Sequence, residues 1–299
     1  MRSRRWGLLV TAVLVVATST GAVLSGQHRT APPPRPVLNR AFLSSASPDA
    51  PAVVWAVGDG ADGGDDARTV FRRIVGDHPA RFLYLGDVYE RGSADDFRDG
   101  FETVYGRLAR ITAPTPGNHD WPAHVDGYDP YWRAQTGAAT PPWYAFRLGG
   151  WRIISLNSEA PHDRGSAQLR WLASELRQGR GTCTLAFWHR PLQSAGRHGD
   201  QADVAPLWKL LRGHVRLVAN GHDHDLQRLR RRDGITELVA GAGGKNHYGL
   251  DGSDRRVAFG DDQRYGALRI ALRPGGAQLA FVAADGSVMD RSRAACSRG

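Results

Sequence analysis

Cysteine and methionine are scarce in this chain of 299 residues, which has two of each. Two cysteines are too few for a zinc site built from four thiolates, and they leave two alternatives, one disulfide or two unpaired thiols. No serine or cysteine stands in a recognisable nucleophile motif. No internal repeat is present, and the only low-complexity tract is a short proline-rich stretch. These absences argue against a zinc site built from thiolates, against an enzyme with a serine or cysteine nucleophile, and against a repeat protein.

The chain also has only a modest excess of positive charge. The formal net charge is +9, and it falls to +6 without residues 1–26, which hold three arginines and no acid. The only dense basic run, RLRRR at residues 228–232, is interpreted as the solvated face of a strand or hairpin. A nucleic-acid partner is therefore disfavoured.

The first 26 residues differ from the rest. A basic start precedes a largely apolar, uncharged run from Trp6 to Gly26, which predicts an export signal or an uncleaved membrane anchor. The stretch SRRWGLL resembles a twin-arginine signal, with Gly7 and Leu9 in place of the usual Phe and Lys. Either alternative predicts a secreted or extracytoplasmic protein that meets a membrane only through this segment. An oxidising compartment favours a disulfide between Cys183 and Cys296.

The remaining sequence predicts a linker and one domain. Residues 27–50 include TAPPPRP, which is typical of a stiff, extended spacer. From residue 51 to 299, short apolar runs alternate with amphipathic stretches. Strands are predicted at 52–59 and 80–87, with helices at 65–77 and 93–110, the latter capped by Ser93. This order predicts an α/β domain, and antiparallel hairpins in the second half indicate a second sheet.

Polar side chains follow five of the predicted strands at the point where each strand ends. They are Asp59, Asp87, Asn118 with His119, His189, and His222 with His224. Because ligands gather at the carboxyl ends of strands in such sheets, we expect these side chains to lie together. Carboxylate, amide and imidazole donors suit divalent or trivalent transition metals. The set exceeds the needs of one ion, so two ions sharing a carboxylate fit better.

Five short motifs occur in the following order along the chain: GDG at Gly58, GDVY at Gly86, GNHD at Gly117, FWH at Phe187 and GHDH at Gly221. They resemble the five blocks of the calcineurin-like metallophosphoesterases, closest to the purple acid phosphatase branch. The resemblance implies a four-layer αββα sandwich with two mixed β-sheets and the site at the edge of the sheets.

The resemblance also implies roles. Asp87 would bridge two metal ions, with Asp59 and His224 on the first. Asn118, His189 and His222 would hold the second.

Three more residues would serve the reaction itself. His119, paired with Asp120, would contact the phosphate and assist the leaving group. His198 corresponds to a histidine that contacts phosphate in related plant enzymes.

One departure concerns the tyrosine whose tyrosinate binds ferric iron in the purple enzymes. Here Tyr89 follows Asp87 by only two residues, and Glu90 occupies the usual place. On an extended segment this shift would turn the side chain away, whereas a bent loop would direct Tyr89 inward as a ligand. Ala61 replaces a further ligand of other branches. Iron with zinc or manganese is the expected metal pair.

The function that the resemblance implies is hydrolysis of small phosphate monoesters by in-line attack of a metal-bound hydroxide. The same centre could serve a phosphodiesterase. A third alternative is a surface binding protein that keeps the site without catalysis.

Overall fold

The computed structural model describes residues 49–178 and 183–296. The predicted signal or anchor at 1–26 lies outside these residues, as does the predicted linker except for its last two positions. Within the described residues, no helix has both the length and the apolar character needed to cross a membrane.

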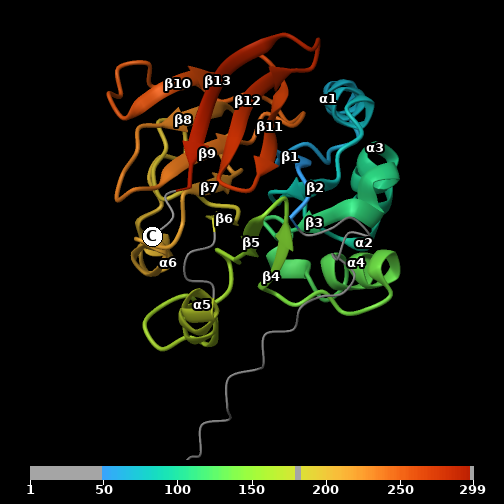
Figure 1. Cartoon of the computed structure of the whole chain (residues 1–299). Coiled ribbons are helices and arrows are strands. Elements are labelled where there is room, and N and C mark those ends of the chain that lie inside the picture. Colours follow the sequence, from blue (N-terminus) through green and yellow to red (C-terminus); the bar gives the residue numbers. More distant parts are fainter. Residues whose placement is uncertain (1–48, 179–182, 297–299) are drawn as a thin grey trace, which may run out of the picture. The chain divides into compact units, whose positions relative to one another are not determined.

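The first sheet has six strands, in the order β13-β12-β11-β1-β2-β3 (Figure 1). Strands β1, β2 and β3 run parallel and end at the β3 edge, and β11, β12 and β13 extend the sheet on the other side of β1 in antiparallel fashion. The bounds are β1 Ala52–Val57, β2 Arg81–Tyr84, β3 Thr112–Pro114, β11 Gly266–Arg273, β12 Gly276–Ala283 and β13 Val288–Ala295.

The second sheet has seven strands, in the order β10-β8-β9-β7-β6-β5-β4. Strands β5, β6, β7 and β9 are parallel, and both edges are antiparallel. The bounds are β4 Tyr144–Leu148, β5 Trp151–Ser155, β6 Cys183–Phe187, β7 Leu217–Asn220, β8 Leu226–Leu229, β9 Thr236–Ala240 and β10 Val257–Asp261.

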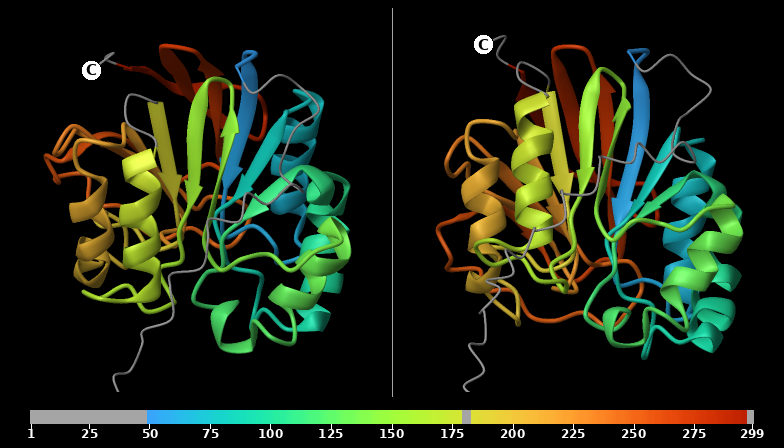
Figure 2. Two further views of the ribbon diagram at one scale, coloured as in Figure 1. Left: turned by 60° about the horizontal axis from the view of Figure 1, so that its bottom comes forward. Right: turned by 90° about the horizontal axis from the view of Figure 1, so that it is seen from below.

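Helices cover the outer faces of both sheets, so the layers follow the order αββα (Figure 2). Helices α1 (Asp65–Gly76), α2 (Ala94–Asp96), α3 (Thr103–Tyr105) and α4 (Tyr128–Thr136) lie on the first sheet, and α5 (Ala167–Gln178) and α6 (Ala205–Leu211) on the second. One buried apolar cluster fills the space between the sheets, and two others join each sheet to its helices. The predicted two-sheet sandwich is confirmed.

Two expectations differ in detail. The stretch predicted as one helix at 93–110 begins with the expected Ser93–Asp96 capping box, but continues as a π-helical segment and ends in a 3₁₀ segment at Ile111. The second sheet exists, yet the C-terminal hairpin belongs to the first. Strand β11 pairs with β1, from Ala52 opposite Leu272 to Ala56 opposite Leu268. Pairing between strands so distant in sequence is set by packing rather than by local pattern.

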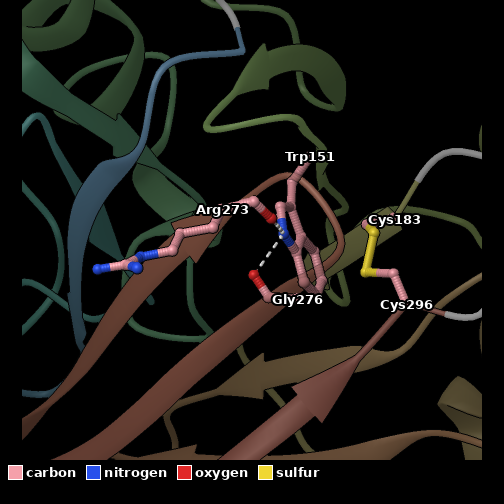
Figure 3. Close-up of a disulfide and its surroundings, with 5 residues drawn as sticks. All are labelled: Trp151, Cys183, Arg273, Gly276 and Cys296. Atoms are coloured by element: carbon pink, nitrogen blue, oxygen red, sulfur yellow. Dashed lines mark hydrogen bonds between the residues drawn. A yellow bond between two sulfur atoms is a disulfide. The ribbon is translucent and has the colours of Figure 1, made fainter.

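The cysteines form one disulfide, Cys183–Cys296, which joins the start of β6 to the end of β13 (Figure 3). Beside it the indole Nε1 of Trp151 donates to the carbonyl oxygens of Arg273, at 3.0 Å, and Gly276, at 3.3 Å. Both contacts join the second sheet to the turn between β11 and β12. The disulfide and the two hydrogen bonds therefore join the two sheets at this end of the sandwich. The polar strand ends meet at the opposite end.

Candidate metal centre

The carboxyl ends of the parallel strands bring the predicted ligands to one edge. Asp59 follows β1, Asp87 follows β2, and His189 and His222 follow β6 and β7 of the other sheet. The backbone N–H of His222 donates to Asp59 Oδ2 at 2.9 Å. Nδ1 of His189 donates to the carbonyl oxygen of Leu85 at 2.8 Å. The two sheets are thus joined directly through the residues that form the site.

The chain turns sharply at these strand ends. Asp59, Asp87 and His222 have positive φ values of 59°, 65° and 74°, which non-glycine residues rarely adopt. Such conformations persist where the surrounding structure holds them, and they cluster at functional sites. Gly117 is required for a different reason, since a Cβ there would lie 2.0 Å from Oδ1 of Asp87. Gly117 therefore makes room for the Asp87 carboxylate.

Three donor atoms form a first group. The hydroxyl oxygen of Tyr89 lies 3.0 Å from Asp59 Oδ1 and 2.9 Å from His224 Nε2. The last two atoms are 3.7 Å apart. All three side chains are buried or nearly so.

A second group lies on the other side of Asp87. Nε2 of His189 is 3.0 Å from Asn118 Oδ1 and 3.2 Å from His222 Nδ1. Oδ2 of Asp87 is 3.3 Å from that His189 nitrogen and 3.4 Å from the Tyr89 hydroxyl. One carboxylate oxygen therefore adjoins both donor groups.

These distances fit a pair of ions. Two ligand atoms about 2.1 Å from one ion and at right angles to each other lie about 3.0 Å apart, close to the spacings within each group. Asp59, Asp87 and His189 by themselves already bring ligand atoms within 4.8 Å of one another. A mixed oxygen and nitrogen donor set of this kind suits transition metals. The residues present thus fit a dinuclear centre with Asp87 shared.

The protonation of the imidazoles also fits. Nδ1 of His189 donates to a backbone carbonyl, as does Nδ1 of His224 to the carbonyl oxygen of Asn246 at 2.8 Å. A carbonyl oxygen only accepts, so each Nδ1 carries a hydrogen. Nε2 of His224, and Nε2 of His189 once that ring has lost its second proton, can then direct a lone pair into the site. Hydrogen bonds of this kind orient ligand histidines in metalloproteins.

Burial and mutual repulsion shift the pKa values of the cluster. Burial raises the pKa of Asp59 well above its usual value. Burial, helped by the nearby His189, lowers the pKa of His222 to about 2, and burial lowers that of His224 to about 4. These two imidazoles are therefore neutral near pH 7, as ligands must be.

Asp87 and His189 behave as an ion pair. Burial acts to raise the pKa of Asp87, but the charge of His189 overcomes it and holds that pKa at about 2. Burial acts to lower the pKa of His189, whereas the carboxylate of Asp87 raises it to about 10. The imidazolium balances the carboxylate charge, so a cation that binds His189 must displace a proton.

Tyr89 points into the centre, despite the shifted spacing. The residues after Asp87 do not form an extended strand: Asp87 has a positive φ, and Val88 makes only an isolated bridge with Ala61. The alternation of an extended chain does not apply to such a loop. Of the two open alternatives, the structure therefore shows the inward one.

The predicted pairing of His119 with Asp120 is wrong. Nδ1 of His119 donates to the carbonyl oxygen of Glu90 at 2.6 Å, and its Nε2 lies 3.9 Å from Asp87 Oδ2. Asp120 is buried and accepts from the backbone N–H groups of Asp87, Val88 and Gly117. The Asp120 carboxylate thus joins two loops, and no hydrogen bond to the His119 ring is present among the described residues.

His198 lies at the rim of the site. Its ring stacks on that of His222, with centroids 4.3 Å apart, and its backbone N–H donates to Asp223 Oδ1 at 2.8 Å. Asp223 also accepts from the hydroxyl of Ser194. The loop that carries His198 is thus held by a buried acid adjacent to the ligand histidines.

Sequence reasoning missed two rim residues in the glycine-rich stretch after β9. Tyr248 stacks on His224, with centroids 4.0 Å apart and planes at 15°. The Nζ atom of Lys245 lies 4.5 Å above the Tyr89 ring and pairs with Glu90. The stretch GAGGKNHYG shows only a turn, and no local pattern indicated which side chains would face the site.

Comparison with known proteins agrees with this geometry. The calcineurin-like phosphoesterase family matches residues 52–226. The chain belongs to this family. It is 29% identical to the tartrate-resistant acid phosphatase type 5 of Rattus norvegicus over 212 residues, 59% of this chain and 63% of that protein. The chain thus spans less than two thirds of that curated relative.

Solved structures share the fold. A purple acid phosphatase from yellow lupin, Lupinus luteus, matches with a TM-score of 0.68 and 15% identity, over 84% of this chain and 55% of that one. GAP50, described as the anchor in the inner membrane complex of Plasmodium, matches with a TM-score of 0.68 and 16% identity, over 83% of this chain and 90% of that one. These neighbours share the fold of the calcineurin-like phosphoesterase family, to which the chain belongs.

Proposed function

We propose that this family member is an exported phosphatase that hydrolyses small phosphate monoesters. The observation that carries the proposal is the position of Asp87 Oδ2, 3.3 Å from His189 Nε2 and 3.4 Å from the Tyr89 hydroxyl. A fold shared with an anchor protein does not by itself imply catalysis, so the proposal depends on this complete donor set.

The seven donors divide between two cations. Asp59, Tyr89 and His224 would hold one, Asn118, His189 and His222 the other, and Asp87 both. Iron with zinc or manganese suits this mixture of carboxylate, phenolate, amide and imidazole. When bound, such a pair neutralises the charge of a phosphate ester and lowers the pKa of bound water to about 7.

The protein residues supply orientation and proton transfer. The ring of His119, held through Nδ1 by the Glu90 carbonyl, presents Nε2 at the mouth of the site beside Asp87. It is the group placed to give a proton to the departing alcohol oxygen. His198, stacked on His222, is placed to contact the phosphate oxygens.

The proposed location outside the cytoplasm is supported by a separate observation, the disulfide. Disulfides persist in oxidising compartments, so the Cys183–Cys296 bridge supports export by residues 1–26. In the proposed arrangement, a linker at 27–50 and a catalytic domain at 51–299 follow this segment. Fractionation of cells that express the full chain would test this. Recovery in the cytoplasm with both thiols free would contradict it.

The activity is tested by comparing hydrolysis of p-nitrophenyl phosphate with that of bis(p-nitrophenyl) phosphate, by metal-loaded protein. We expect the higher kcat/KM for the monoester. Faster diester turnover would identify a phosphodiesterase instead. No turnover of either ester by protein with two bound ions would favour a surface binding protein.

A further inference from the structure

Arginines gather on the outer face of strands β11, β12 and β13, away from the metal centre. Arg269 lies opposite Ala280, which lies opposite Arg291. One register step along, Ala271, Gln278 and Arg293 form a parallel row. Because alternate residues face the same side of a sheet, these side chains share one surface, with small residues between the arginines. We name this surface the outer arginine face. It is made of Arg269, Arg273, Arg291 and Arg293 from the strands, with Arg73 of α1, which lines the same groove as Arg269 and Arg291.

The positive charge of this surface is largely unpaired. Residues lining the three grooves that cross it include all five arginines and one acid, Asp77. Asp77 accepts from Arg269 Nε at 2.7 Å. Among the described residues, Arg273, Arg291 and Arg293 make no ion pair. A concentration of unpaired charge of one sign favours an anionic partner.

An apolar side chain borders the same surface. Within residues 49–178 and 183–296, Val288 is one of two large hydrophobic residues that are exposed, at 40%. It lines a groove with Arg73 and Arg291. Arginines beside an exposed apolar residue suit the boundary between lipid headgroups and acyl chains better than a fully hydrated polymer.

The chain enters the domain next to this surface. Strand β1 starts with Ala52 opposite Leu272, the residue before Arg273. The sequence that precedes it contains the proline-rich linker and the apolar run predicted to reach a membrane. Asp59 lies beyond the end of β1 that is opposite to Ala52 and Arg273. A membrane held against the arginines would leave the metal centre open.

We propose that the outer arginine face docks on an anionic phospholipid surface. The contact is additional to the N-terminal segment, and it does not depend on the phosphatase activity. It would hold the domain beside the bilayer in one orientation, with the site turned away from the lipid.

Cosedimentation of the full chain with vesicles tests this docking. Vesicles of phosphatidylcholine alone are compared with vesicles containing phosphatidylglycerol, at low and high salt. The variant Arg273→Gln/Arg291→Gln/Arg293→Gln removes the unpaired charges. The control Arg177→Gln/Arg212→Gln/Arg231→Gln removes three exposed arginines elsewhere. All proteins keep the N-terminal segment, so binding to neutral vesicles reports that segment.

We expect wild-type protein to bind the anionic vesicles more tightly, with the difference lost at high salt. At roughly fivefold per charge, the first variant should lose about 100-fold in affinity for anionic vesicles, with an unchanged circular dichroism spectrum and unchanged p-nitrophenyl phosphate turnover. Equal losses in both triple variants would overturn the proposal, as would equal binding of wild-type protein to neutral and anionic vesicles. Retention by soluble polyphosphate but not by vesicles would identify a different partner.

Discussion

The hydroxyl oxygen of Tyr89 lies 3.0 Å from Asp59 Oδ1 and 2.9 Å from His224 Nε2, so a tyrosine at an unusual spacing joins the donor set. A tyrosinate bound to ferric iron absorbs visible light, and this makes the contact testable.

Tyr89→Phe should abolish the visible charge-transfer band of iron-loaded protein, because it removes only the ligand oxygen. The measurement is an absorption spectrum of protein reconstituted with ferric iron and zinc. Tyr248→Phe is the matched control: its ring stacks on His224, and its hydroxyl makes no hydrogen bond to the described residues. A spectrum that is the same in wild type and Tyr89→Phe would exclude Tyr89 as a ligand.

Asp87→Asn should lower both metal content and activity, since one carboxylate oxygen adjoins both donor groups. We expect a loss of about 10³-fold in kcat/KM, in keeping with the large effects of removing an electrostatic group at a reacting centre. Elemental analysis should show less than one ion per chain. The exposed Asp163→Asn serves as control, and two retained ions in Asp87→Asn would remove the basis for a shared carboxylate.

His119→Ala should slow hydrolysis according to the leaving group. Loss of a proton donor costs about 10²–10⁴-fold where the alcohol must be protonated. We therefore expect a large decrease in kcat for alkyl phosphates and a small one for p-nitrophenyl phosphate, whose phenolate leaves without a proton. Equal decreases for both substrates would assign His119 a binding role instead.

Removal of the disulfide should destabilise the fold without changing the site. Cys183 and Cys296 are separated by 113 residues, and cross-links that close long loops contribute about 2–5 kcal/mol. The variant Cys183→Ser/Cys296→Ser should show this loss in urea unfolding, and a reductant should affect wild type alone. If reductant left the wild-type midpoint unchanged, the bridge would carry no stability.

Asp77 predicts a pH-dependent contribution to stability. Burial acts to raise its pKa, but hydrogen bonds from Arg269 and the Trp55 indole outweigh it, so the folded-state pKa lies below the usual value. A lowered acid pKa stabilises the fold above the unfolded-state pKa of about 3.9, and this contribution is lost as the pH falls through the folded-state value.

Asp77→Asn should therefore lower the free energy of unfolding by about 1–3 kcal/mol at pH 7, and the difference from wild type should shrink below pH of about 4. Urea unfolding at several pH values measures it. Asp126→Asn, at an exposed position, should have no such effect. A constant difference from pH 3 to 7 would show that the carboxylate charge is not the cause.

Much of the fold was predictable because it has a local signature. Apolar runs that end in Gly-Asp, Gly-Asn or Gly-His placed β1, β2, β3 and β7 and their polar ends correctly. The capping box at Ser93 was also confirmed, since it involves residues three apart. The helix that follows changes type along its length, which a periodic pattern does not report.

The amino-acid sequence by itself determined which side chains follow the strands, because Asp59, Asp87, Asn118, His189 and His222 each lie two to four residues after the strand that precedes them. Only the tertiary structure decided which strands become neighbours and where loop side chains point. It placed the C-terminal hairpin beside β1, turned Tyr89 inward, and gave His119 the Glu90 carbonyl instead of Asp120 as its partner. These outcomes depend on contacts between residues far apart in the chain and on backbone angles that packing imposes. No short pattern encodes them.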